Sequence, residues 1–226
     1  MNRRRLIAFS AVVVAAMVTL GAFAWIQLPP GAEMPIHWGP DGTPNGYAPK
    51  TIGLLLLPLT AAGLAILLAF IPRFEPRRAN LERSGKAYGA IWVGVMLLMA
   101  GIQVIVVATT LGGSPDMSRL MLLGIGALYL VIGNYLPKVR PNYMMGIRTP
   151  WTLTSDLAWT RTHRIGGRLF VAEGLLFIAL GLVGVAPEVL AVAIVGGIVV
   201  LLVVLFAYSY QVWRSDPDRR SLGGDA

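Results

Sequence analysis

The sequence predicts an all-α membrane protein, a polytopic bundle of six transmembrane helices that forms one integral domain over residues 1–226. Hydrophobic residues make up 56% of the chain and charged residues only 13%, against about 25% charged residues in an ordinary soluble domain. The mean hydropathy is +0.68. A helix needs roughly 20 mainly apolar residues to cross a hydrocarbon core about 30 Å thick, and six runs are long enough. The predicted spans are residues 6–28, 52–71, 87–111, 120–136, 169–186 and 189–210.

The first span needs to be distinguished from a secretion signal. It follows Arg3, Arg4 and Arg5 and contains the small-residue pattern of residues 22–24, both of which are typical of such a signal. The apolar core of a signal is usually only about 7 to 15 residues long. Because this run is much longer, we expect a retained transmembrane helix.

The positive residues predict the orientation of the helices. Seventeen of the 19 lysines and arginines lie in the amino terminus, in the connections after the second and fourth spans, and in the tail; only Lys50 and Arg119 lie elsewhere. Positive residues concentrate on the cytoplasmic side of membrane proteins, so we expect both termini to be cytoplasmic. Topology therefore explains the net charge of +8, and no direct nucleic-acid partner is predicted. The polar tail, residues 214–226, is expected to be disordered.

The residues available for chemistry argue against an enzyme. The chain has no cysteine, which excludes disulfides, thiolate metal sites and cysteine nucleophiles. The two histidines, His37 and His163, are predicted on opposite sides of the membrane and cannot share a site. His163 has Asp156 and Thr160 as helical neighbours, but no nucleophile elbow or oxyanion hole is evident. We predict no catalytic residue, no metal and no cofactor.

The first outer connection, residues 29–51, is predicted to be a compact extracellular cap. Its six prolines restrict the backbone, and Pro40-Asp41-Gly42 and Asn45-Gly46 are typical of tight turns. Its aromatic residues are either a belt that anchors the loop at the headgroups or a recognition surface for a ligand arriving from outside. The candidate ligand-binding residues of the cap are His37, Trp38, Asp41, Asn45 and Tyr47.

The fourth connection, residues 137–168, is predicted to be a cytoplasmic loop with a short interfacial helix. Pro150 favours an extended Thr149. A helix is expected after Thr154 or Ser155, either of which can cap it. Residues 166–167, two glycines, are expected to break or bend the chain before the fifth span. The segment is either an anchor on the inner leaflet or a docked polar network that presents a surface to a cytoplasmic partner.

Glu173 lies inside the fifth predicted span, where a carboxylate is costly unless it is paired or faces water. Arg168 is near enough along the chain to be the expected partner. The alternative is a proton or ion role, which would make the protein a small membrane transporter or channel.

The two polar connections resemble a known family. Residues 145–167, MGIRTPWTLTSDLAWTRTHRIGG, resemble the signature of the Sdp immunity and signalling family of bacterial membrane proteins. Residues 35–50, PIHWGPDGTPNGYAPK, resemble an uncharacterised extracellular motif that often precedes it in longer members. The matching signature positions are Arg148, Thr149, Pro150, Trp151, Thr152, Trp159, Thr162, His163, Arg164 and Gly166, to which we add Asp156 as a candidate partner-binding residue.

The resemblance implies a function and a set of partners. It implies a multi-pass protein of the bacterial plasma membrane that confers resistance to a secreted peptide toxin acting on the membrane. In the best-known member, the protein also signals the presence of toxin by sequestering a small repressor. The implied partners are the lipid bilayer, a toxin on the outer face and a repressor on the inner face; the sequence does not specify which toxin or repressor, or the oligomeric state.

Overall fold

The computed structural model describes residues 2–39 and 42–219. In this part of the chain, six helices are long and apolar enough to cross a membrane, and the prediction of an all-α polytopic bundle is confirmed. Each begins and ends within a few residues of a predicted span, except α7, which begins earlier. They are α1 (Arg3–Gln27), α2 (Lys50–Phe74), α4 (Gly85–Thr110), α5 (Met117–Tyr135), α7 (Asp156–Val183) and α8 (Pro187–Arg214).

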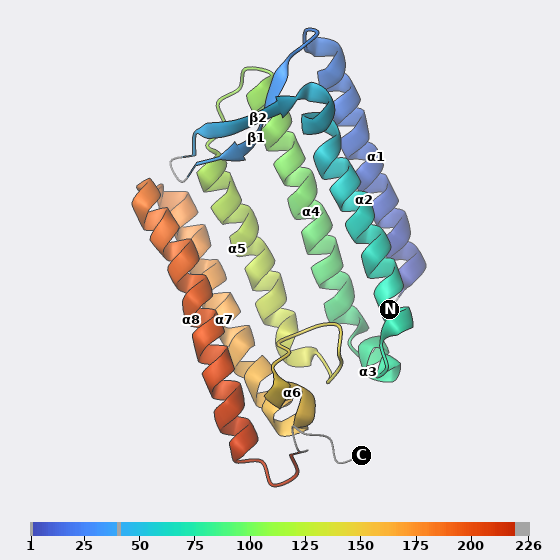
Figure 1. The fold of residues 1–226 in the computed structure, drawn as a ribbon, viewed down its shortest axis with the longest axis vertical. Coiled ribbons are helices and arrows are strands. Elements are labelled where there is room, and N and C mark those ends of the chain that lie inside the picture. The colour runs from blue at the N-terminus through green and yellow to red at the C-terminus, as the bar shows by residue number, and fades with distance from the viewer. Residues whose placement is uncertain (1, 40–41, 220–226) are drawn as a thin grey trace.

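The short elements lie at the two ends of the bundle (Figure 1). One end, here called the hairpin end, carries the strands β1 (Glu33–Trp38) and β2 (Pro44–Pro49). The other, here called the α6 end, carries α3 (Arg78–Arg83), the 3-10 helix η1 (Leu136–Lys138) and α6 (Pro150–Thr154). The start of α1 and the end of α8 also lie at the α6 end. The arginine-rich connections are therefore collected at one end of the bundle.

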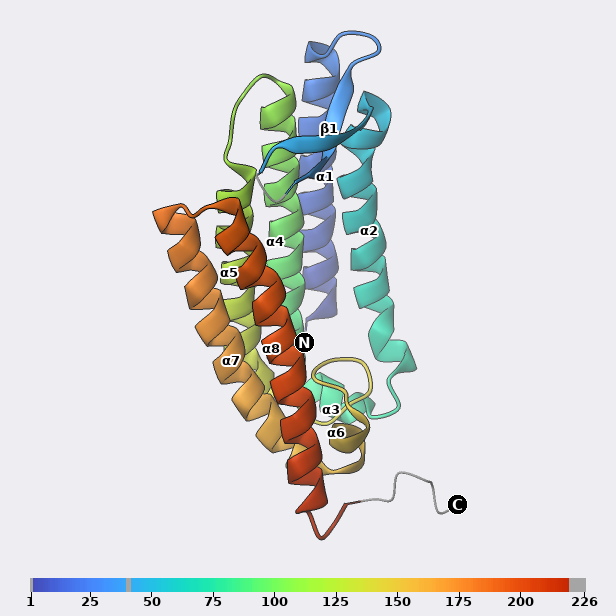
Figure 2. The ribbon, with the colours of Figure 1, turned by 60° about the vertical axis from the view of Figure 1, so that its left-hand side comes forward.

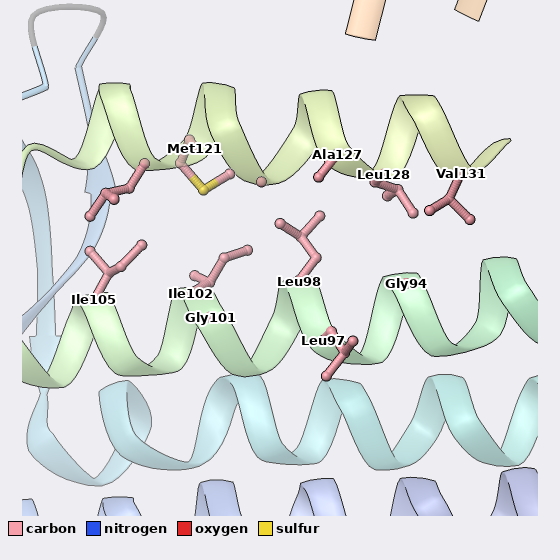
Figure 3. A pocket seen from close by; sticks show the side chains of 12 residues that line it. Gly94, Leu97, Leu98, Gly101, Ile102, Ile105, Met121, Ala127, Leu128 and Val131 are labelled. Atoms are coloured by element: carbon pink, nitrogen blue, oxygen red, sulfur yellow. The ribbon is translucent and has the colours of Figure 1, made fainter. Parts of the chain in front are cut away.

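The long helices form two groups of three (Figures 1 and 2). The first group consists of α1, α2 and α4, which pack against one another. In the second group, α7 packs against both α5 and α8. The contact between α4 and α5 joins the two groups. In the first group, the buried Trp92 donates its indole hydrogen to Ser10 Oγ at 2.8 Å. The junction of the groups holds an apolar groove of about 300 Å³ (Figure 3). Small residues such as Gly101 and Ala127 contribute to its lining.

Helices α5 and α7 approach closely at paired glycines. A Cβ added to Gly126 would lie 2.8 Å from the carbonyl oxygen of Gly174, and a Cβ on Gly174 would lie 2.8 Å from that of Gly126. Gly133 and Gly167 form a second reciprocal pair, with both distances 2.7 Å. Small residues that let backbones approach closely are typical of membrane helix interfaces. We call these four residues the glycine seam.

The predicted helix break at residues 166–167 is wrong. Helix α7 runs without interruption from Asp156 to Val183, so the expected short interfacial helix is the first part of a long one. Gly167 lies in the seam, and a Cβ on Gly166 would meet the Ile147 side chain at 2.5 Å. Neighbouring helices occupy the space that side chains would fill, and this packing outweighs the low helix propensity of glycine.

The hairpin differs from the predicted turns of the outer loop. Asn45 and Gly46 do not form a turn; they belong to β2, which pairs antiparallel with β1. The register is irregular around His37, which pairs with Gly46. A Cβ on Gly46 would lie 3.0 Å from the Cβ of His37, so the glycine provides room for this crowded pair. The other predicted turn includes Pro40 and Asp41, which lie outside the described residues.

The described start of the tail, residues 215–219, makes contacts with the helices. Asp216 is buried; its Oδ2 accepts a hydrogen bond from Ser155 Oγ at 2.5 Å, and its Oδ1 accepts one from the Asp218 backbone at 3.0 Å. Ser155 is also the N-cap of α7. The chain after α8 is thus held against the beginning of α7. Residues 220–226 of the predicted disordered tail lie outside the described part of the chain.

Candidate functional site

The signature segment forms a network of buried polar side chains at the α6 end. The chain between η1 and α7 forms hydrogen bonds with the segment between α2 and α4, with α7 and with α8. The α6-end network, as the name is used here, consists of Glu75, Ser84, Asn142, Thr149, Thr152, Ser155, His163, Ser209 and Asp216, all of which are buried.

Asn142 organises the loop after η1. Its side chain is 0% exposed and makes four hydrogen bonds. The amide nitrogen donates to the carbonyl oxygens of Arg140 at 2.8 Å and Met145 at 3.0 Å. The amide oxygen accepts from the backbone of Met144 at 2.8 Å and of Met145 at 2.7 Å. One side chain thus replaces the backbone partners that this irregular segment lacks.

His163 is fully engaged within the protein. Its Nε2 accepts the backbone N–H of Ile147 at 3.0 Å, and its Nδ1 lies 2.8 Å from the carbonyl oxygen of Trp159. An imidazole that accepts at Nε2 and donates at Nδ1 is neutral. Its ring stacks on that of Trp159, with centroids 4.0 Å apart. Gly146, with φ +115°, has no side chain to collide with the histidine. Both ring nitrogens are used, which supports a structural role.

Thr149 and Thr152 cap α6 and connect it to α8. Each hydroxyl oxygen accepts the other residue's backbone N–H, which forms a capping box. Thr149 is extended as expected, with φ −94° and ψ 161°, and its hydroxyl donates to Ser209 Oγ at 3.0 Å. Trp151 packs edge-on against Phe206 of α8 with ring centroids 4.5 Å apart. These contacts fix α6 on the end of α8.

The network also reaches the first helical group. Glu75 is 4% exposed, and its two carboxylate oxygens accept the backbone N–H groups of Arg77 at 2.7 Å and Tyr143 at 2.9 Å. Ser84 Oγ accepts the backbone N–H of Arg140 at 2.9 Å. The sequence patterns did not single out Glu75, Ser84, Ser209 or Asp216 as members of a site. The only available signal was that Glu75 is an acidic residue within a basic connection.

The signature residues are divided between the interior and the surface. The buried ones are Thr149, Thr152, Trp159, Thr162, His163 and Gly166, and Trp151 is half-buried. The exposed ones are Arg148, Pro150 and Arg164, and the added candidate Asp156 is exposed as well. Arg148 donates from Nη1 to the Tyr143 carbonyl oxygen at 2.6 Å, and Asp156 lies 3.9 Å from Arg77 Nη1. In this conformation the exposed set and part of Trp151 are accessible from outside the protein.

At the opposite end, the hairpin exposes several of the predicted ligand-binding residues. His37, Asn45 and Tyr47 are exposed and Trp38 is half-buried. His37 Nδ1 lies 2.5 Å from Asn45 Oδ1, so these two side chains form one polar surface. Asp41 lies outside the described residues.

The hairpin is held on the helices by both apolar and polar contacts. Met34 is 0% exposed and packs on Gly53, where a Cβ would lie 2.7 Å from that of Met34. Lys50 donates to the carbonyl oxygen of Leu28 at 2.9 Å and lies over the Trp25 ring. Gly42, near the tip, approaches Ser118 at the start of α5. The hairpin therefore contacts both helical groups.

Glu173 does not form the expected pair with Arg168. The glutamate is 8% exposed, and neither carboxylate oxygen has a hydrogen-bond partner within the described residues. It points at Gly197 of α8, where a Cβ would collide with it. Arg168 is exposed. In the described ranges, no group of three or more histidine, aspartate or glutamate residues could hold a metal ion.

Two segments of the chain match known protein families. Residues 138–209, from η1 to Ser209 on α8, match the SdpI/YfhL protein family. Residues 12–62, which include the hairpin, match a domain of unknown function, DUF1648. The chain is 23% identical over 145 residues to "Immunity protein SdpI" of Bacillus subtilis (strain 168), covering 64% of this chain and 67% of that protein. No solved structure matches the chain.

Proposed function

We propose that this chain, a multi-pass membrane protein of the SdpI type, is a nonenzymatic protein that protects a bacterial cell from a secreted peptide toxin. The observation that carries the proposal is the match of residues 138–209 to the SdpI/YfhL family, supported by the similarity to an immunity protein. The proposed orientation places the arginine-rich α6 end in the cytoplasm, because positive residues of membrane proteins concentrate on the cytoplasmic side. The hairpin then faces outward.

The hairpin is the proposed input surface. It exposes two apolar side chains, Ile36 at 40% and Tyr47 at 55%, beside the polar pair of His37 and Asn45. A mixed aromatic and polar surface is typical of protein and peptide recognition. Met34 of the hairpin is buried and packs against Gly53 of α2. A toxin that moves the hairpin would therefore also move the helices that contact it.

The α6 end is the proposed output surface. The exposed signature residues Arg148 and Arg164, together with Asp156, are the residues that a cytoplasmic repressor could contact. Helix α5 joins the two ends: its first residues adjoin the hairpin tip at Ser118, and its last turn continues into η1. A toxin signals through such a path only if it binds two arrangements of the helices with different affinity.

The proposal is tested by challenge of living cells. The chain is expressed in Bacillus subtilis that lacks its own SdpI, and the cells are exposed to secreted peptide toxins that kill this strain. We expect the unmodified chain to protect. The His37→Ala/Tyr47→Ala variant is expected to lower the tolerated toxin concentration about tenfold, because truncation of an aromatic residue that anchors an interface costs at least this much affinity.

The matched control is Val189→Ala, which removes an exposed apolar side chain at the start of α8, outside the hairpin. It should protect as well as the unmodified chain at equal membrane abundance. If the unmodified chain protects against none of the toxins, the immunity function is contradicted. Full protection by the double variant would instead contradict the hairpin as input.

Glu173 supports a second candidate function, a small transporter or channel. Its two unpartnered oxygens lie in the buried region between α7 and α8, and an intramembrane carboxylate without a partner is typical of ion or proton pathways. In liposomes, this function predicts proton flux for the unmodified chain, loss of flux to background for Glu173→Gln, and unchanged flux for Glu188→Gln, an exposed glutamate on α8. Absence of flux from the unmodified chain would eliminate transport of protons.

A further inference from the structure

A second apolar groove lies between α5, α7 and α8. It has a volume of about 490 Å³, within the range of roughly 300–1,000 Å³ that is common for ligand sites. Tyr129, Phe170, Leu202 and Phe206 contribute to its walls, and residues 147–150 line its α6 end. It is distinct from the groove of Figure 3, which lies between α4 and α5.

The groove has different chemistry along its length. On α8 it is lined from Ile198 to Phe206 by apolar side chains, a distance of about 12 Å along the helix axis. Arg148 supplies a positive charge at the α6 end. An occupant must therefore be apolar over most of its length and negatively charged at one end.

No carboxylate among residues 2–39 and 42–219 forms an ion pair with Arg148. Its Nη1 donates to the Tyr143 carbonyl oxygen, and the two ion pairs found among the described residues involve other arginines. The side chain is exposed, so its remaining donors can reach an external group. The hydroxyl of the adjacent Thr149 is already engaged by Ser209. Arg148 is thus the positively charged group at the α6 end of the groove.

We infer that this groove binds an anionic phospholipid, with an acyl chain along α8 and the phosphate on Arg148. Ile198, Leu202 and Phe206 are exposed along the helix, as expected for a surface that faces hydrocarbon. Arginine also matches the geometry of a phosphate through paired N–H donors. The inference goes beyond the proposed function, because it requires neither a toxin nor a repressor.

Bound lipid would act on the network that holds the α6 end together. The segment that closes the groove includes Thr149, whose hydrogen bonds connect α6 to α8. A ligand that binds the folded protein and not the unfolded chain stabilises it by an amount that grows with the concentration of the ligand and with its affinity. An anionic lipid is therefore expected to raise the thermal stability of the protein more than a zwitterionic one.

The test uses the full-length protein purified in detergent and titrated with phosphatidylglycerol or phosphatidylcholine. Native mass spectrometry measures retained lipid, and thermal unfolding measures stability. We expect the unmodified protein to prefer phosphatidylglycerol about tenfold, because both lipids carry a phosphate but the choline cation of phosphatidylcholine offsets the attraction of that phosphate to Arg148. Arg148→Gln should abolish the preference, and Arg148→Lys, which keeps the charge, should retain most of it. The matched control is Arg161→Gln, which removes an exposed arginine of α7 and should keep the preference.

The acyl-chain part of the site is tested by filling each groove. Leu202→Trp fills the groove at an exposed position and should reduce retention of both lipids. Gly101→Leu fills the groove between α4 and α5, where a Cβ meets no atom within 4 Å, and should not change retention. Equal binding of both lipids by the unmodified protein would overturn the inference. An unchanged lipid preference in Arg148→Gln would also overturn the inference. An equal loss of the preference in Arg161→Gln would overturn it as well, because it would indicate that the basic surface attracts anionic lipid without a specific site.

Discussion

Asn142→Asp is expected to destabilise the folded protein by roughly 2–5 kcal/mol, because each buried group left without its partner costs about 1–3 kcal/mol. The change is nearly isosteric, but it replaces an amide that donates to the carbonyl oxygens of Arg140 and Met145. An ionised aspartate would place negative charge against both oxygens, and a protonated one would supply at most a single donor. Thermal unfolding in detergent and proteolysis of residues 139–149 are the measurements.

A matched control is Asn2→Asp. Asn2 caps α1 with its side-chain oxygen, which accepts the backbone N–H of Arg5 at 3.2 Å. Aspartate keeps this acceptor and is favourable at a helix N-terminus, so stability should be unchanged or slightly higher. If Asn142→Asp unfolds at the same temperature as Asn2→Asp, the loop does not depend on Asn142 for its structure.

Gly174→Ala is expected to destabilise the packing of α5 against α7 by about 1–3 kcal/mol, the usual cost of overpacking, and Gly174→Leu by more. The added Cβ would lie 2.8 Å from the carbonyl oxygen of Gly126, which is backbone and cannot rotate away. Relief requires the two helices to separate, which weakens the second pair of the seam as well. Thermal unfolding of the two variants in detergent measures the effect.

Gly196→Ala is the control for helix propensity. A Cβ at Gly196 meets no atom within 4 Å, and alanine is favoured over glycine within a helix by about 1 kcal/mol. This variant should be as stable as the unmodified protein or slightly more so. Equal stability of Gly174→Ala and Gly196→Ala would show that the seam tolerates separation.

Local sequence patterns predicted several details of the signature segment correctly. Pro150 restricts Thr149, and Thr149 is extended. Ser155 caps α7, and Asp156 lies in its first turn. Trp159 and His163, four residues apart on a helix, stack against each other. Each of these outcomes depends on a few neighbouring residues, so the sequence contained the necessary information.

The sequence alone determined that this is a bundle of six long apolar helices, because length and composition suffice for that conclusion. The tertiary structure decided what its glycines and polar residues do. Gly167 permits contact between helices instead of a break, since Gly133 faces it. The partners in the network lie far apart along the chain, 68 residues for Glu75 with Tyr143 and 61 for Ser155 with Asp216. Such pairs form only when the helices pack, because no local pattern brings them together.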